Sequence, residues 1–155
     1  MDVCRIRVQS PIGPLTLTGT EDALTEIAFG GVEDGTEVSS PVLEQAAQEL
    51  AEYFDRKRRD FSVPLAPQGT EFQKKVWNAL REVPYGTTVS YKDIAVRLGK
   101  PGAAIAVGQA NGRNPIPIII PCHRIIGAGG KLVGYTGGLE IKKALLAVEG
   151  VLGTA

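Results

Sequence analysis

Residues 90–112 read SYKDIAVRLGKPGAAIAVGQANG, and this stretch decides what kind of fold the chain can have. Ser90 is a residue type that helix N-caps prefer, and apolar residues follow it at helical spacing until Gly99 and Pro101 interrupt them. A second helical segment follows the interruption. Two helices joined by such a short turn have the spacing of a helix-turn-helix, although two helices that merely pack together have it too.

The second of these helices has mostly small side chains. Its small residues are Ala103, Ala104, Ala106, Gly108 and Ala110. A helix of this kind could enter the DNA minor groove, which is only about 6 Å wide and excludes an ordinary recognition helix. Close packing against another helix also needs small residues, so the composition alone leaves both interpretations open.

A capped helix is also predicted upstream of this pair. Thr70 and Gln73 have the spacing of a capping box, and the helical pattern FQKKVWNALREV (72–83) stops before Pro84. The preceding segment, FSVPLAPQG (61–69), contains two prolines and a glycine and has no helical period. We therefore expect it to connect two subdomains.

The N-terminal third predicts a small sheet with one helix. VCRIRV (3–8) alternates in polarity, a second strand follows the turn at residues 11–13, and LTEIAFGG (24–31) suggests a third. A helix is then expected with Ser40 as N-cap and Pro41 at its first position. Its last turn is expected to carry the basic run RKRR.

These elements predict an α/β (α+β) protein in two parts. A sheet-and-helix subdomain (1–60) and the connection (61–69) precede a mostly helical subdomain (70–155) with a winged-helix-like helix-turn-helix. No apolar run approaches the roughly 20 residues of a membrane span. The first residues lack a basic-then-apolar export signal, so we expect a cytoplasmic protein with two reduced cysteines and no membrane partner.

The net charge of zero hides an asymmetry between the two parts. Residues 1–69 hold 12 acidic and 6 basic side chains, whereas residues 70–155 hold 5 acidic and 11 basic ones. The basic part could bind nucleic acid, or its charges could simply be solvated surface. The run RKRR (56–59) could also bind nucleic acid. Its simpler explanation is that basic side chains at a helix C-terminus interact favourably with the helix dipole.

The single histidine follows one of the two cysteines, in IIIPCHRIIG (118–127), which otherwise reads as a buried strand. A cysteine attacks as its thiolate, and a histidine backed by a carboxylate supplies one at neutral pH. Because neighbours in an extended chain point to opposite faces, a bridging water would have to connect Cys122 with His123. The alternative is a core cysteine beside a structural histidine.

The third member of such a relay should be an acidic residue of the basic part. The choices are Glu71, Glu82, Asp93, Glu140 and Glu149. Glu149 ends the apolar helix LEIKKALLAVEG (139–150), where a lone acid after LLAV indicates a partly buried partner.

The residues around PCHR resemble the active-site segment of the methylated-DNA–protein-cysteine methyltransferases, also called alkylguanine-DNA alkyltransferases. The shared motifs are PCHR between branched apolar residues, the preceding NP, and then GYTGGL and LAVEG, with FQKKVWNAL, VPYGTTVSYKDIA and GQANGRNP upstream. The resemblance is strong over 70–150 and only in outline over 1–60. It implies direct repair of O6-alkylguanine: the base is flipped out of the duplex, and its alkyl group moves irreversibly to a cysteine, once per molecule.

The resemblance gives each catalytic residue a role. Cys122 accepts the alkyl group, His123 deprotonates it through a water, and Glu149 fixes the tautomer of that histidine. Asn114 links the helix-turn-helix to the active-site segment. No cofactor is implied, and no metal site is expected because Cys4 is the only cysteine of the N-terminal part and has no histidine near it.

The resemblance also implies that a monomer binds double-stranded DNA containing O6-alkylguanine, with the helix 103–110 in the minor groove. Tyr91 would turn the target nucleotide outward. The further DNA- or substrate-binding residues it implies are Gln73 at a helix N-terminus, Ala104, Gly108 and Arg113 in or after the groove helix, Ala128 near the DNA, and Tyr135 and Thr136 beside the alkylated oxygen.

One position departs from the family pattern. Members commonly have an arginine in the groove helix that fills the space of the flipped base, and here that position is Ile105. The change suggests impaired flipping or weaker DNA binding, unless another residue such as Arg113 compensates. Two other functions stay open: a noncatalytic protein that binds alkylated DNA, and a Cys-His hydrolase that reuses its thiolate.

Overall fold

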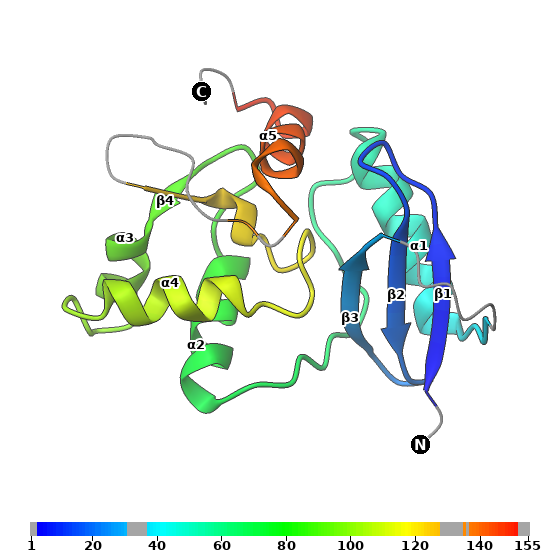
Figure 1. Ribbon diagram of the computed structural model, residues 1–155, viewed down its shortest axis with the longest axis horizontal. Helices are drawn as coiled ribbons and strands as arrows, with labels where there is room; N and C mark the ends of the chain where they lie inside the picture. Colours follow the sequence, from blue (N-terminus) through cyan, green and yellow to red (C-terminus); the bar gives the residue numbers. More distant parts are fainter. Residues whose placement is uncertain (1–2, 31–36, 128–134, 136, 152–155) are drawn as a thin grey trace. The chain divides into compact units, whose positions relative to one another are not determined.

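The computed structural model describes residues 3–30, 37–127, 135 and 137–151. The chain divides into two compact units, Met1–Gln68 and Gly69–Ala155. The first contains a sheet and one helix and the second is mostly helical, which confirms the predicted mixed α/β class (Figure 1). Two of the predicted substrate contacts, Ala128 and Thr136, lie outside the described residues.

The first unit is a three-stranded antiparallel sheet covered by a helix. Strands β1 (Cys4–Val8), β2 (Leu15–Gly19) and β3 (Leu24–Phe29) pair in chain order, and α1 (Pro41–Phe54) packs against one face of the sheet (Figure 1). The predicted cap is confirmed, because the Ser40 side chain accepts a hydrogen bond from the first turn of α1. The core of this unit lies between the sheet and the helix.

The basic run 56–59 does not end α1 as predicted. The helix stops at Phe54, and the left-handed φ of 61° at Arg56 turns the chain away from the helix axis. The Arg58 guanidinium then folds back and pairs with Glu52 of α1, with 2.7 Å between Nε and Oε1. At least this arginine of the run therefore holds an ion pair within its own unit.

The segment expected as a connection hydrogen-bonds to the first unit over part of its length. The backbone N–H of Leu24 donates to Pro64 (2.9 Å), and the N–H of Ala66 donates to the carbonyl of Leu24 (2.8 Å). Leu65 thereby forms a short parallel bridge beside β3. Two backbone hydrogen bonds hold residues 64–66 against β3, although their sequence has no strand-like alternation.

The described residues of the second unit form four α-helices, which are α2 (Glu71–Arg81), α3 (Tyr91–Arg97), α4 (Ala104–Gly112) and α5 (Leu139–Val148). Helices α2 and α3 both begin with a capping box, as the sequence predicts for α2. Helix α2 packs on both α3 and α4, which form the predicted helix-turn-helix (Figure 1). Trp77 ties α2 to α4 by donating its indole N–H to the carbonyl of Ala110 (2.9 Å).

The stretch 118–127 is not the continuous strand that its apolar residues suggest. Residues up to 120 form turns, Cys122–Arg124 form a 3-10 turn, and only β5 (Ile125–Ile126) is a strand, paired in parallel with β4 (Val89–Ser90). The prolines at 115, 117 and 121 have no N–H to donate to a sheet. In addition, Ile118 has a φ of 76°, which is rare for a β-branched residue and bends the chain.

Candidate active site

Asn114 shapes the turn that leads into the cysteine. Its side-chain Nδ2 donates to the carbonyl of Ile120 (2.8 Å), and its Oδ1 accepts from the N–H of Ile116 (2.9 Å). The asparagine is 6% exposed, so both bonds lie in a largely dry environment where they hold the turn firmly. The end of α4 and the start of the Cys122 segment are thus joined through one side chain.

The thiol of Cys122 is buried and resists ionisation. The residue is 2% exposed, and burial raises its pKa to about 11. Hydrogen bonds with Asn114 and Tyr135 and the positive charge of Lys142 act in the opposite direction, because each favours the thiolate. At neutral pH the resting cysteine is a thiol, so its use as a nucleophile requires a base.

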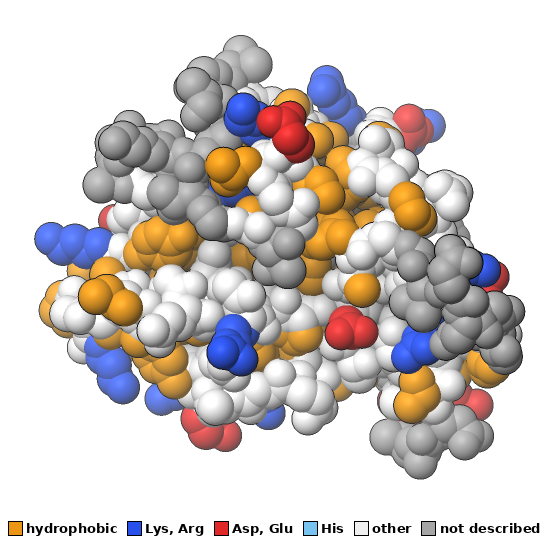
Figure 2. Space-filling model, in the orientation of Figure 1, with side chains coloured by type: hydrophobic (Ala, Val, Ile, Leu, Met, Phe, Trp, Pro, Cys, Tyr) orange, Lys and Arg blue, Asp and Glu red, His pale blue; other side chains and the backbone are white. Residues whose placement is uncertain are grey.

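His123, the next residue in the chain, is placed against a carboxylate. It is fully buried, and its Nε2 lies 2.6 Å from Oε2 of Glu149. No histidine is visible on the face drawn in Figure 2, in keeping with this burial. Burial lowers the pKa of His123 although the carboxylate beside it favours the charged form, so the resting imidazole is neutral. With Nε2–H donated to Glu149, the proton-accepting nitrogen is Nδ1, which has no hydrogen-bond partner among the described residues.

Glu149 is held as a carboxylate by four donors. Besides His123, its oxygens accept from Arg124 Nε (2.9 Å), Arg124 Nη2 (3.0 Å) and the backbone N–H of Gly86 (3.2 Å). Burial alone would raise the pKa of Glu149, but the hydrogen bonds from His123 and Arg124 outweigh it and hold the pKa well below its usual range. The sequence choice among five acids therefore selected the residue that the structure places against His123.

Arg124 and Lys142 were not singled out from the sequence. Arg124 clamps Glu149 with two nitrogens and donates through Nη1 to the carbonyl of Val83 (2.7 Å). Lys142 is fully buried and donates to the carbonyl of Ile125 (2.6 Å), and burial lowers its pKa to about 8. A signal for Lys142 existed: it precedes the buried Leu145 by three positions, and so lies on the apolar side of α5.

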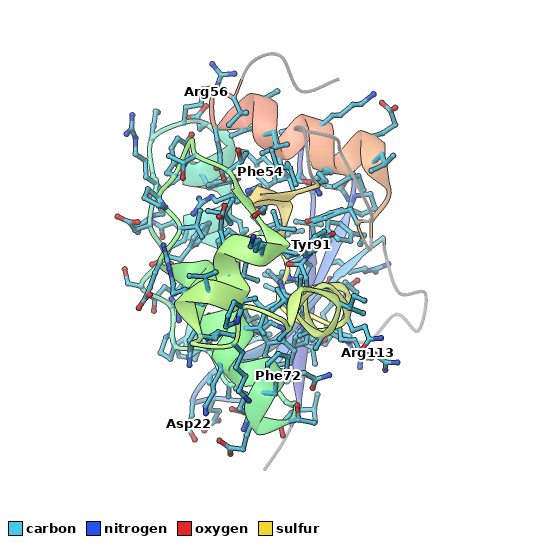
Figure 3. All side chains as sticks on the ribbon, turned by 90° about the vertical axis from the view of Figure 1, so that its left-hand side faces the viewer. Asp22, Phe54, Arg56, Phe72, Tyr91 and Arg113 are labelled. Atoms are coloured by element: carbon cyan, nitrogen blue, oxygen red, sulfur yellow. The ribbon has the colours of Figure 1, made fainter. Side chains whose placement is uncertain are left out.

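Tyr91 stands at the start of α3, next to α4. A side chain added at Gly108 would meet the Tyr91 ring at 3.6 Å, so the glycine leaves room for the tyrosine against α4. Figure 3, which looks along α4, shows Tyr91 on the side of α3 and Arg113 at the C-terminal end of α4. Burial is the main cause that raises the pKa of Tyr91, and a thiolate at Cys122 raises it further.

Three predicted DNA contacts on or just after α4 differ in exposure. Ile105 is 80% exposed, the highest value among the exposed large apolar side chains of the described residues. Ala104, beside it, is half-buried, whereas Arg113, just past the end of the helix, is exposed. The structure therefore presents Ile105 and Arg113 outward from the helix-turn-helix.

The backbone N–H of Gln73, predicted to contact phosphate, is already used inside α2. It donates to the Thr70 side chain (3.1 Å), and the Gln73 side chain accepts from the N–H of Thr70 (2.9 Å). Within the described residues, no group of three or more metal-ligating side chains forms a metal site, and no helix is long and apolar enough to cross a membrane.

Comparison with known proteins gives two family matches that cover most of the chain. A model described as the DNA binding domain of 6-O-methylguanine DNA methyltransferase matches residues 71–151, and the ribonuclease-like domain of the same protein matches residues 5–67. A methylated-DNA–protein-cysteine methyltransferase of Methanosarcina acetivorans is 51% identical over 148 residues, which are 92% of this chain and 95% of the relative.

Solved structures are similar as well. The crystal structure of Mycobacterium tuberculosis OGT in complex with DNA is 48% identical and covers 92% of this chain and 90% of its own, with a TM-score of 0.84. An O6-methylguanine DNA methyltransferase from Methanococcus jannaschii is 30% identical over 97% of this chain and 95% of its own, with a TM-score of 0.69.

Proposed function

Because the chain belongs to the 6-O-methylguanine DNA methyltransferase family, we propose that it repairs O6-alkylguanine in double-stranded DNA by moving the alkyl group to Cys122. The observation that carries this proposal is the buried contact of 2.6 Å between Glu149 and His123, the residue that follows the buried Cys122 in the chain. A structural histidine would use both ring nitrogens in the core, whereas here Nδ1 is left to accept a proton.

The proposed transfer is balanced without a cofactor. Sγ of Cys122 attacks the alkyl carbon, a carbon–sulfur bond forms, and the bond between that carbon and O6 of guanine breaks. The thiol proton passes through a water to Nδ1 of His123, and the imidazolium then gives up this one proton through water to the departing guanine, which regains its neutral form. Glu149 stabilises the transient imidazolium, as an orienting carboxylate does in other relays.

The product explains why each molecule would act once. A thioether has no easy reverse step, and Cys4, the other cysteine of the chain, is buried and belongs to the first unit. Asn114 and Tyr135, whose hydrogen bonds favour the thiolate, would lose that interaction when the sulfur is alkylated. Alkylation therefore removes the nucleophile permanently.

Access to the alkylated oxygen requires that the base leave the duplex, at a cost of a few kcal/mol. We assign α4 to the minor groove, Tyr91 to rotation of the target nucleotide, and Ile105 to the space beside it. Apolar side chains are known to unstack base steps, but isoleucine offers the orphaned base no hydrogen bond. Tyr135, with Ala128 and Thr136, is assigned to the pocket and its DNA-facing edge.

The test is the intact mass of the protein after it is mixed with an excess of duplex containing O6-methylguanine. We expect one methyl group per molecule, mapped by peptide analysis to Cys122, and no further reaction when fresh duplex is added. Cys4→Ser should gain the same mass and Cys122→Ser none. An unchanged protein that binds the duplex would support a noncatalytic binder, and demethylation of more than one duplex per unmodified protein would support a hydrolase.

A further inference from the structure

One polar side chain on the exposed face of α4 has no part in the proposed chemistry. Ile105, Gln109 and Arg113 are all exposed and follow one another at four-residue spacing, so they lie along one face of the helix. Between the first two, only the small residues Ala106 and Gly108 are not fully buried. Gln109 is therefore the side chain that projects from this face next to Ile105.

The amide of Gln109 is available to an outside partner. It makes no hydrogen bond or ion pair with any residue that the structure describes, and α4 carries no charged residue that could compete for it. The buried amide of Asn111, two positions further on, points instead into the unit and is 4% exposed. A glutamine held on a helix face in this way is a hydrogen-bonding group for the surface that the helix contacts.

We infer that Gln109 reads a base pair flanking the alkylated guanine and favours G·C over A·T. The inference rests on the proposed function, with α4 in the minor groove. Every base pair presents N3 or O2 acceptors there, but only guanine adds an N2 amino donor. The glutamine NH2 group can donate to these acceptors in any base pair, but its carbonyl oxygen finds a donor only in the guanine amino group and is left unpaired by an A·T pair.

The position of Gln109 along the helix sets which base pair it reaches. Four residues from Ile105 correspond to about 6 Å of helix rise. Successive base pairs are about 3.4 Å apart, so Gln109 faces a pair one or two steps from the place of Ile105. In this proposal Gln109 contacts a neighbouring base pair, and the alkylated base itself is bound at Cys122.

The experiment compares rates of methyl transfer from duplexes that differ only near the lesion. The first and second pairs on each side of O6-methylguanine are set to G·C, A·T or inosine·C, which lacks the amino group of guanine in the minor groove. For wild type at one flanking position we expect G·C to react roughly threefold to tenfold faster than A·T, with inosine·C close to A·T. Gln109→Ala should reduce this ratio to within about 1.5-fold at the same position.

Two controls separate the amide from other causes. Asn78→Ala removes an exposed amide from α2 and should leave the preference unchanged. G·C and A·T duplexes also differ in stability, and that difference affects the wild type and Gln109→Ala alike. Only the part of the G·C preference that Gln109→Ala loses is therefore due to the side chain. Free O6-benzylguanine should react equally with wild type and both variants, which shows that the thiol and its relay are intact.

The outcomes distinguish this inference from the proposed function. Methyl transfer with the same flanking preference in Gln109→Ala as in wild type would overturn the inference alone, and so would inosine·C that reacts like G·C in wild type. Failure of every duplex and of free O6-benzylguanine to alkylate Cys122 would overturn the proposed function and this inference with it.

Discussion

The catalytic centre and the exposed face of α4 belong to one unit and are built in opposite ways. In the centre, His123 is fully buried and the carboxylate of Glu149 has four hydrogen-bond donors within 3.2 Å. On α4, Ile105 is 80% exposed, and the side-chain amide of Gln109 bonds to none of the described residues. The carboxylate of the first region finds its donors within the chain, whereas the side chains of the second are assigned by the proposed function to contacts with DNA.

This contrast separates substitutions into two kinds. A change in the catalytic centre should alter the reaction with every alkylated substrate, and often stability, because its groups depend on one another. A change on the α4 face should alter only the reaction with DNA. Free alkylguanine and alkylated duplex are therefore the pair of substrates that tests the comparison.

The largest effect is expected from Cys122→Ser. The variant should transfer no methyl group to any substrate, because a serine hydroxyl beside a single histidine is a much poorer nucleophile than a thiolate. It should still bind duplex DNA, since the exposed face of α4 is unchanged. Methyl transfer by this variant, measured as protein mass, would show that the wrong nucleophile was assigned, and Cys4→Ser serves as the matched cysteine control.

A smaller loss is expected from His123→Ala. General-base catalysis is typically worth about 100-fold or more, so transfer from both free and duplex substrates should slow by at least that factor at neutral pH. Because burial places the pKa of Cys122 at about 11, raising the pH toward 11 forms thiolate without the histidine. The deficit of the variant should therefore shrink as the pH rises, and a deficit that stays constant with pH would contradict the role of base.

Glu149→Gln should slow transfer as His123→Ala does, but it should also reduce stability. The substitution leaves the buried charge of Arg124 without its partner, which typically costs about 3 kcal/mol or more. Since the pKa of Glu149 is lowered in the folded state, its contribution is present above the ordinary carboxyl pKa near 4.5 and is lost as the pH falls below it. Thermal unfolding at pH 7 and pH 3 should show a difference between wild type and variant that narrows in acid.

Lys142→Met should have a moderate effect on rate and a distinct effect on stability. It removes a positive charge that favours the Cys122 thiolate, so transfer should slow about tenfold or less if the charge shifts the thiol pKa by up to one unit. In wild type the folded state loses the Lys142 proton near pH 8 and the unfolded state near 10.5. Wild-type stability should therefore rise relative to the variant between these values, as measured by denaturant unfolding.

The sequence predicted helices in both units of the chain because the signals that start and end a helix are local. Thr70, Ser40 and Ser90 cap helices where their spacing places them, and α3 stops shortly before Gly99, which has a left-handed φ of 75°. The stretch 118–127 was wrongly predicted to be a strand. Its apolar residues do not reveal that the Asn114 side chain, instead of a neighbouring strand, makes hydrogen bonds with the backbone here. The apolar composition of this stretch fits a buried turn as well as it fits a strand.

The catalytic centre was only partly predictable for a related reason. Cys122 and His123 are adjacent in the chain, and Glu149 was recognisable as a lone acid at the end of an apolar helix. Arg124 and Lys142 act through contacts with Glu149, Val83 and Ile125, and the segments that supply these partners come together only in the fold. The sequence marks a charged residue, but it does not mark which charges become buried together.

The smallest effect is expected from Ile105→Arg, and it tests the α4 face alone. Arginine adds a charge and hydrogen-bond donors for the orphaned base, so repair of duplex should become several-fold faster, and binding should depend on salt with a slope steeper by about one unit. Because the residue is 80% exposed, the substitution should not disturb folding, and the rate with free O6-benzylguanine should stay within about twofold. The measurement is the pair of rates for wild type and variant on the two substrates. Equal duplex rates and affinities would place the flipping contact elsewhere, with Arg113 as the next residue to substitute, whereas a change in the free-substrate rate would mean that the α4 face and the catalytic centre are coupled.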